Sequence, residues 1–272
     1  MTIIIPILIC LAIAAVCAII LTVSNVLFGV QEDEKFLAIR DALPGANCGA
    51  CGYSGCDGYA RALSEGKITE TTLCVPGGAS AAGDIASALG VEAGEVVRKM
   101  AFVGCNGTCA ATKKDEKGLL EGVTTCKEAA AKWEGEGVCI YACIGLGDCV
   151  AVCPEEGIVI KDGIAKVISS SCLGCGLCAK TCPHGVIRIM KAENTVAVNC
   201  SNHDKGALTR KMCTNGCIGC TKCVRTCPNG AISMDNNLAV IDYEKCTNCG
   251  ACAEACPMHV IHNDAFICDK CL

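Results

Sequence analysis

The first thirty residues are almost entirely apolar. Residues 3–21 contain no charged side chain, and the uncharged run continues to Val30. A membrane-spanning helix needs about 20 apolar residues, and the run has neither a basic leader nor a small-residue cleavage site. The pattern predicts an uncleaved transmembrane anchor over residues 1–30. Lys35 and Arg40, the first basic residues, follow this run and favour a cytoplasmic location for the rest of the chain.

Beyond the predicted anchor the hydrophobic segments are short. Residues 157–168 form two apolar runs around Asp162-Gly163, and residues 231–241 form two around Asn236-Asn237. Such turn residues between short apolar runs predict β-hairpins. Short helices are expected over residues 57–65, 91–102 and 128–133. The chain is therefore expected to be an α+β protein.

The cysteines between Cys139 and Cys256 form an internal duplication. One constant offset, the distance along the chain from Cys149 to Cys223, superposes six cysteines of one copy on six of the other. The superposed cysteines are Cys149, Cys153, Cys172, Cys175, Cys178 and Cys182 on Cys223, Cys227, Cys246, Cys249, Cys252 and Cys256. Each copy has two Cys-Pro steps at the same separation, so each copy contains two half-units. We call this constant distance the repeat offset.

Three of the four half-units follow the run C-x2-C-x2-C-x3-C-P of bacterial ferredoxins, whose fourth cysteine ligates the cluster of the other half-unit. This rule predicts four [4Fe-4S] clusters. Their predicted ligands are Cys139, Cys143, Cys149 and Cys182; Cys172, Cys175, Cys178 and Cys153; Cys217, Cys220, Cys223 and Cys256; and Cys246, Cys249, Cys252 and Cys227. The wider spacing from Cys139 to Cys149 requires that loop to bulge. Zinc also binds C-x2-C pairs, but it does not explain the third cysteine and the proline.

A separate block holds four more cysteines, Cys48, Cys51, Cys56 and Cys74, with glycines between the first three. Glycine lets the backbone curl closely around a bound group. The block predicts a fifth [4Fe-4S] cluster, with zinc as the alternative, since a lone four-cysteine site fits either metal.

Several cysteines have no obvious partners. Cys105, Cys109 and Cys126 could form part of a sixth site, although the more economical interpretation is small buried thiols. Cys200, Cys213, Cys268 and Cys271 are also unassigned. Cys10 and Cys17 lie seven residues apart in the predicted anchor, where apolar packing is the expected role. His184 and His259 follow Cys-Pro steps, and we expect both to be exposed.

Composition limits the function. The chain has 272 residues with 29 cysteines and a net charge of −5. Such a charge argues against general nucleic-acid binding, and a disulfide framework suits short exported domains better than this chain. The sequence contains neither a dinucleotide-binding glycine motif nor a P-loop. Redox centres without a substrate pocket indicate an electron carrier.

The order of these parts resembles the B subunit of the Rnf complex, the ion-translocating ferredoxin:NAD+ oxidoreductase of bacteria. The resemblance rests on the uncharged N-terminal span, the segment from Asn47 to Cys56, and the ferredoxin motifs. The motifs themselves divide the chain into a transmembrane anchor (1–30), a four-cysteine [4Fe-4S] domain (31–90), a linker or helical segment (91–136) and two tandem two-cluster ferredoxin domains (137–198 and 199–272). Many relatives carry one ferredoxin unit, so the second unit leaves the order of electron flow open.

The resemblance further implies a translocase subunit at the cytoplasmic membrane, with its soluble domains on the cytoplasmic side. Its partners would be reduced ferredoxin as donor and the other membrane subunits. Na+ and H+ both remain open as the pumped ion. We expect electrons to enter at the C-terminal cluster pair and leave through the Cys48 block. A basic group at Lys205, Arg210, Lys211, Lys222 and Arg225 either steers an acidic donor or is simply solvated.

Two other classes of function stay open at this stage. The chain could be a polyferredoxin electron-transfer subunit of another membrane enzyme, such as a hydrogenase or dehydrogenase. It could also be a membrane-tethered redox sensor, although a sensor needs one labile cluster rather than five.

Overall fold

The computed structural model describes residues 11, 13–23, 33–112, 122–132, 138–264 and 266. Residues 13–23 are helical, with exposed side chains. The rest of the predicted anchor, including Cys10, lies outside the described residues, as do Cys268 and Cys271. Within the described part of the chain, no helix has the length and apolarity that a bilayer crossing requires.

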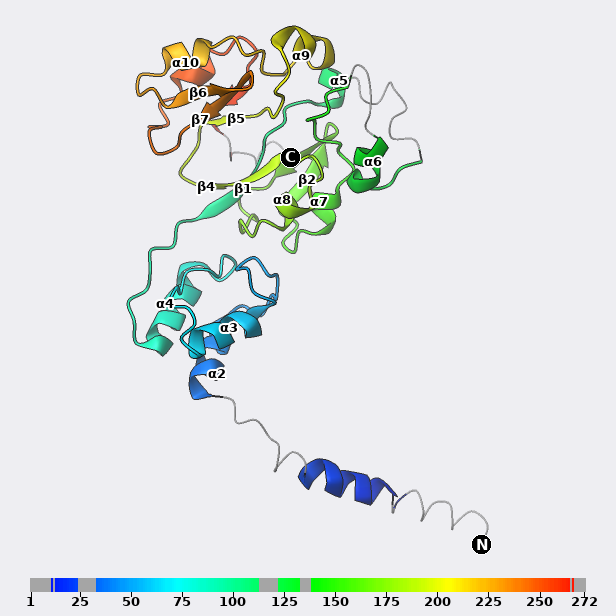
Figure 1. Cartoon of the computed structure of the whole chain (residues 1–272), viewed down its shortest axis with the longest axis vertical. Helices are drawn as coiled ribbons and strands as arrows, with labels where there is room; N and C mark the ends of the chain where they lie inside the picture. Colours follow the sequence, from blue (N-terminus) through cyan, green and yellow to red (C-terminus); the bar gives the residue numbers. More distant parts are fainter. Residues whose placement is uncertain are drawn as a thin grey trace.

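A small three-helix domain follows, comprising α2 (Glu34–Asp41), α3 (Cys56–Ser64) and α4 (Gly78–Leu89). The α3 helix confirms the helix predicted over residues 57–65. The α4 helix is rich in alanine, the best helix former, and ends at Gly90 in the left-handed conformation, with φ of 69°. Ile39, Tyr59 and Ile85 are buried between the helices. Figure 1 shows this domain apart from the remaining, larger lobe.

The larger lobe begins with a first ferredoxin unit. Its strands form two antiparallel two-stranded sheets, β1 with β4 and β2 with β3. Its elements are β1 (Lys99–Val103), α5 (Cys109–Thr112), α6 (Cys126–Lys132), α7 (Asp148–Ala151), β2 (Ile158–Lys161), β3 (Ile164–Val167), α8 (Leu177–Thr181) and β4 (Ile187–Lys191). The β2–β3 hairpin confirms the one predicted over residues 157–168, and α6 agrees with the helix predicted near residue 128.

A second ferredoxin unit repeats this plan. The outer strands β5 and β8 pair with each other, and β6 pairs with β7. Its elements are β5 (Ala197–Val198), α9 (Gly206–Met212), α10 (Lys222–Thr226), β6 (Ile232–Asp235), β7 (Leu238–Ile241), α11 (Ala251–Glu254) and β8 (Ile261–His262). The β6–β7 hairpin confirms the second predicted hairpin. In Figure 1, α9 and α10 lie at the end of the molecule remote from α2.

Strand register extends the duplication upstream of the cysteine motifs. Val103 of β1 pairs with Ile187, and Val198 of β5 pairs with Ile261. Ile187 and Ile261 are themselves separated by the repeat offset. Val103 and Val198 therefore hold equivalent positions, although the first unit has a longer segment between its first strand and its first cluster loop.

The helix predicted over residues 91–102 is wrong. Residues 91–98 have no regular secondary structure, and residues 99–103 form β1. The strand pairs along its whole length with β4, and four of its five residues are buried. The segment predicted as a linker thus supplies an outer strand of the first ferredoxin unit. A pairing between segments so distant in sequence overrides a weak local helical preference.

Candidate iron–sulfur sites

The second ferredoxin unit brings one predicted ligand set together. Cys217, Cys220, Cys223 and Cys256 line a single cavity of about 370 Å³. Gly219 lies in this loop with φ of 65°, and an added Cβ would come within 3.0 Å of the carbonyl oxygen of Asn237 in the hairpin turn. The loop packs so closely against the hairpin that a side chain there would push the Asn237 backbone aside by a few tenths of an ångström.

The first unit brings a second predicted set together. Cys153, Cys172, Cys175 and Cys178 line a cavity of about 350 Å³. Backbone N–H groups point at these sulfurs: Gly157 donates to Cys153 Sγ at 3.2 Å, and Ala101 of β1 donates to Cys172 Sγ at 3.3 Å. Amide donors of this kind stabilise thiolate ligands and tune cluster potentials.

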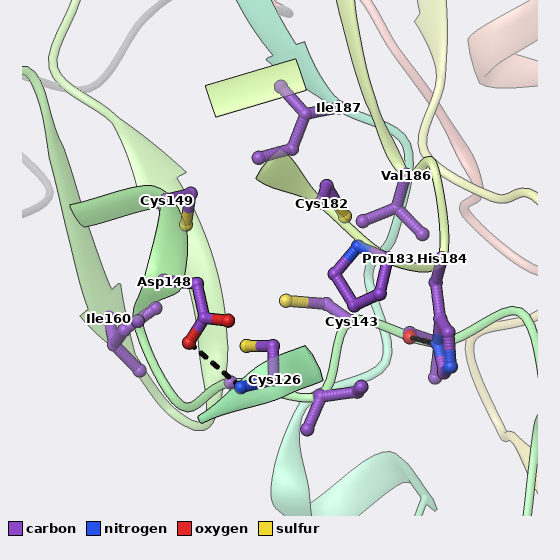
Figure 2. A pocket seen from close by; sticks show the side chains of 14 residues that line it. Cys126, Cys143, Asp148, Cys149, Ile160, Cys182, Pro183, His184, Val186 and Ile187 are labelled. Carbon is purple, nitrogen blue, oxygen red and sulfur yellow. Dashed lines mark hydrogen bonds between the residues drawn. The ribbon is translucent and has the colours of Figure 1, made fainter. Parts of the chain in front are cut away.

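The remaining site of the first unit differs from the predicted set in one member. Cys143, Cys149 and Cys182 line a cavity of about 360 Å³ together with Cys126, whereas Cys139 is absent from its lining. The four sulfurs face a common space in Figure 2. Leu146 occupies the position that the repeat offset relates to Cys220. Cys126, at the start of α6, therefore takes the place that the irregular loop leaves without a thiol.

Asp148 holds Cys126 in position. Its carboxylate accepts hydrogen bonds from the backbone N–H groups of Cys126 at 2.8 Å and Lys127 at 3.1 Å. A carboxylate on the exposed amides of a helix start is favourable because the helix N-terminus carries partial positive charge. Figure 2 shows the bond to Cys126 beside the cavity.

Three members of the last predicted set of the second unit, Cys227, Cys246 and Cys252, lie near one another. Burial raises the pKa of the Cys252 thiol, and the nearby charges of Cys227 and Cys246 raise it further. The backbone N–H of Ala231 donates to Cys227 Sγ at 3.3 Å, the counterpart of the Gly157 bond in the first unit. Cys249, the fourth predicted member, is exposed.

The four cysteines of the three-helix domain lie near one another. Burial raises the pKa of Cys74, with smaller contributions in the same direction from the charges of Cys56, Cys51 and Cys48. The Asn47 side chain accepts a hydrogen bond from the backbone N–H of Cys56 at 2.9 Å and so fixes the loop onto the start of α3. Cys48 is also close enough to Cys175 for its charge to raise the pKa of that thiol.

A further four cysteines border another cavity. Cys105, Cys139, Cys200 and Cys213 line a space of about 300 Å³, and all four are buried. The sequence interpretation grouped Cys105 with Cys109 and Cys126 instead. Cys109 is not among the residues that line this cavity, and Cys126 belongs to the Cys143 site. The missed signal was the spacing of Cys139 and Cys213, which are also separated by the repeat offset.

Burial determines the protonation of the cysteine thiols in these sets. It raises the pKa of Cys139 and Cys149 to about 12, and that of Cys178, Cys200 and Cys223 to about 11. A buried thiolate therefore needs a compensating positive charge, which a bound metal provides by displacing the thiol proton. The donor sets thus fit a metal centre with thiolate ligands.

The spatial arrangement distinguishes a cluster from a single ion. Among the described residues, no three cysteine, histidine, aspartate or glutamate side chains are grouped to hold one metal ion. In four of the sets the sulfurs instead border a shared cavity. Zinc needs four ligand atoms within about 2.3 Å of one ion. Sulfurs spread around a cavity fit a cluster of several irons.

One histidine departs from expectation. His184 lines the Cys126 cavity, and its Nδ1 lies 2.7 Å from the carbonyl oxygen of Ala142. We expected it to be exposed, but it is only partly so. His259 is exposed, as predicted. His184 therefore contacts the surroundings of a candidate site, where hydrogen bonds to ligand loops orient the first coordination sphere.

Comparison with known families agrees with this cysteine arrangement. A family described as "Putative Fe-S cluster" matches residues 43–76, and a "4Fe-4S dicluster domain" family matches residues 142–186 and 216–260. A second family with the latter description matches residues 171–232. These matches identify the duplicated lobe as [4Fe-4S] dicluster domains.

Three relatives are similar over nearly the whole chain. The B subunit of the Na(+)-translocating ferredoxin:NAD(+) oxidoreductase complex of Acetobacterium woodii is 40% identical, over 90% of this chain and 73% of the relative. The B subunit of the proton-translocating complex of Clostridium ljungdahlii is 38% identical, over 89% and 86% respectively. The B subunit of the ion-translocating oxidoreductase complex of Methanosarcina acetivorans is 36% identical, over 89% and 91%. The chain belongs to the family of B subunits of the ion-translocating ferredoxin:NAD(+) oxidoreductase complexes.

Proposed function

We propose that this chain carries electrons from reduced ferredoxin into a membrane complex that couples ferredoxin:NAD+ oxidoreduction to Na+ or H+ translocation. The observation that carries the proposal is the succession of four-cysteine sets from the C-terminal unit to the three-helix domain. Bound [4Fe-4S] clusters would supply one-electron carriers at these sets. The chain itself contributes ligands, a fixed spacing and burial.

Adjacent sets lie close enough to influence one another. Burial raises the pKa of the Cys149 thiol. The charges of Cys143 and Cys126, and of Cys178 from the neighbouring set, raise this pKa further. At the outer end of that unit, burial raises the pKa of the Cys175 thiol, and the charge of Cys48 raises it further. These proximities give electrons a route from the first ferredoxin unit to the three-helix domain.

Five ligand sets belong to this proposal. Four of them are as the sequence predicts, and in the fifth Cys126 replaces Cys139. The sets are Cys48, Cys51, Cys56 and Cys74; Cys126, Cys143, Cys149 and Cys182; Cys153, Cys172, Cys175 and Cys178; Cys217, Cys220, Cys223 and Cys256; and Cys227, Cys246, Cys249 and Cys252.

The C-terminal unit offers a surface for the donor. Lys205, Arg210, Lys211, Lys222 and Arg225 are all exposed, on and next to α9 and α10. None of the ion pairs found among the described residues involves these five side chains. Reduced ferredoxin of acidic character would be steered here by charge complementarity, close to the Cys217 set.

The apolar N-terminal run completes the proposal. We assign residues 1–30 to a single-pass anchor, since a charge-free run of this length suits a bilayer. The three-helix domain, residues 31–90, would then lie next to the membrane, and the ferredoxin units would face the cytoplasm. Electrons would enter at residues 199–272 and leave through the Cys48 set toward the other subunits.

Anaerobic purification of the complex tests this function. Iron and acid-labile sulfide should be present in equal amounts, and EPR during stepwise reduction should reveal several low-potential [4Fe-4S] signals. Membranes that contain the complex should reduce NAD+ with ferredoxin, and membranes from a strain lacking this chain should not. Colourless protein that holds zinc and no sulfide would overturn the proposal.

A further inference from the structure

The cavity at Cys105, Cys139, Cys200 and Cys213 lies between the two ferredoxin units. Cys105 and Cys139 come from the first unit, and Cys200 and Cys213 come from the second. The proposed five-cluster relay does not use this site. All four side chains are at most 9% exposed. Four buried thiols converging on one cavity at a domain junction require an explanation.

The duplication relates each of the two cysteines of the first unit to one cysteine of the second unit. Cys139 and Cys213 each precede the first cysteine of a cluster loop, Cys143 or Cys217, by four residues. Cys105 and Cys200 each follow the equivalent strand residues Val103 and Val198 by two. Each unit therefore presents the same pair of thiols, and the two pairs face each other across the junction.

The hydrogen bonds at the site repeat with the same symmetry. Cys105 Sγ accepts from the backbone N–H of Gly107 at 3.4 Å and of Cys143 at 3.3 Å. Cys200 Sγ accepts from the backbone N–H of Asn202 at 3.5 Å and of Cys217 at 3.3 Å. The equivalent sulfurs Cys105 Sγ and Cys200 Sγ thus each receive two of the amide donors that are typical of cluster ligands.

The units are fastened together around the cavity. Ser201 Oγ donates to the carbonyl oxygen of Gly104 at 2.9 Å, and Asn215 Nδ2 donates to that of Asn106 at 3.1 Å. The backbone N–H of Thr214 also donates to the carbonyl oxygen of Ala111 at 3.1 Å. These bonds fix the relative positions of the two thiol pairs, which a site with ligands from both units requires.

We propose that Cys105, Cys139, Cys200 and Cys213 ligate a sixth [4Fe-4S] cluster that connects the two ferredoxin units. The cavity is similar in volume to the three that the cluster motifs line, about 300 Å³ against 350–370 Å³. This inference rests on the proposed electron-transfer function and extends it.

The position of the site explains its use. Cys143, a member of the Cys126 set, and Cys217, of the second unit, each donate a hydrogen bond to one of its sulfurs. One electron could therefore pass from the Cys217 set to the Cys126 set through this site. Reduced ferredoxin supplies that electron, and the Cys126 set accepts it from this site. Only the oxidation state of the iron would change, and the thiolate ligands would stay the same, so no further reactant is needed.

Iron counts on the anaerobically purified full-length chain test the assignment. The double variant Cys105→Ala/Cys213→Ala should lose about one-sixth of the iron and of the sulfide, together with one EPR signal. The control Cys109→Ala, from the same segment but outside the cavity lining, should lose neither. An unchanged iron and sulfide content in the double variant would overturn the sixth cluster and leave the five-cluster proposal intact. Selective loss of zinc at unchanged iron would also overturn it.

A gentler variant guards against loss of folding. Asn202 is 2% exposed, and its Nδ2 donates to Cys139 Sγ at 3.3 Å. Asn202→Ala retains all four thiols but removes this donor, so one cluster should shift to a lower reduction potential while the iron content is unchanged. No shift of any signal in Asn202→Ala, or a wild-type chain with iron for only five clusters, would contradict the inference. Absence of sulfide from the wild type would instead overturn the proposed function itself.

Discussion

Asp148, which immediately precedes Cys149, accepts a hydrogen bond from the backbone N–H of Cys126 at 2.8 Å. This bond joins the inserted helix α6 to the cluster loop that Cys126 completes. Asp148→Ala removes it together with the bond to Lys127, at a cost of about 1 kcal/mol, typical of a lost helix cap. We expect an iron chelator to remove one cluster faster from this variant than from the wild type. The visible absorbance of the clusters measures this loss.

Asp148→Asn is the matched control for this prediction. The amide oxygen still accepts one of the two hydrogen bonds, whereas the other bond and the charge at the helix N-terminus are lost. Cluster loss should therefore be slower in Asp148→Asn than in Asp148→Ala. Equal stability of the wild type and Asp148→Ala would mean that α6 does not need this tether.

Cys126 takes the place of a cysteine that the loop from Cys143 to Cys149 lacks, and this suggests a rescue experiment. Cys126→Ser should remove one cluster, because three thiols remain at its cavity. Adding Leu146→Cys would restore the spacing C-x2-C-x2-C from residue 143 to residue 149, as in the second unit. Iron and sulfide counts should return to wild-type values in the double variant. Cys139→Ser should not be rescued by Leu146→Cys, because Cys139 lines a different cavity.

The proposed direction of electron flow can be tested at the Cys217 set. Cys217→Ser should prevent ferredoxin from reducing the Cys48 cluster, whereas dithionite, a small reductant, should still reduce it. Parallel EPR titrations with the two reductants would separate these outcomes. Unchanged oxidation of ferredoxin by variants at Cys217, Cys220 or Cys223 would place electron uptake elsewhere.

Charge reversal tests the docking surface separately. Lys222→Glu/Arg225→Glu should slow association with reduced ferredoxin by about tenfold at low ionic strength, since steering contributes mainly to the association rate. The difference should shrink as added salt screens the charges. Lys180→Glu reverses an exposed charge on α8 of the first unit and should have little effect. Stopped-flow measurements over a range of salt concentrations would detect both results.

Alkaline pH should destabilise the three-helix domain through Tyr59. Burial raises the pKa of this phenol from 10.0 to about 12, and its hydroxyl donates to the carbonyl oxygen of Glu70 at 2.7 Å. The folded state holds the phenol proton more tightly than the unfolded state. This contribution to the free energy of unfolding is therefore fully present below pH 10 and is lost as the pH rises toward 12. Thermal unfolding followed by circular dichroism should show the decline.

Tyr59→Phe should remove that part of the alkaline decline, although loss of the hydrogen bond lowers stability at neutral pH. The control Tyr53→Phe changes the neighbouring ring, whose centroid lies 5.5 Å from that of Tyr59, but keeps the Tyr59 hydroxyl. It should therefore retain the alkaline decline in stability. An identical pH profile in the wild type and Tyr59→Phe would exclude Tyr59 as the cause.

The sequence alone determined the features that depend on local spacing. The ferredoxin runs at Cys172 and Cys217 and the turn at Asp162-Gly163 each specify a geometry within a few residues. A loop of three cysteines at fixed spacing must curl around a cluster, and Asp-Gly strongly favours a hairpin. The constant repeat offset then carried the same interpretation from one unit to the other.

Only the tertiary structure decided which distant residues meet. Cys139, four residues before Cys143, joins Cys213 from the other unit, while Cys126 reaches the Cys143 cavity through an inserted helix. The strand Lys99–Val103 likewise forms because β4 pairs with it. Contacts between remote segments depend on how the whole chain packs, and local propensity is too weak to specify them.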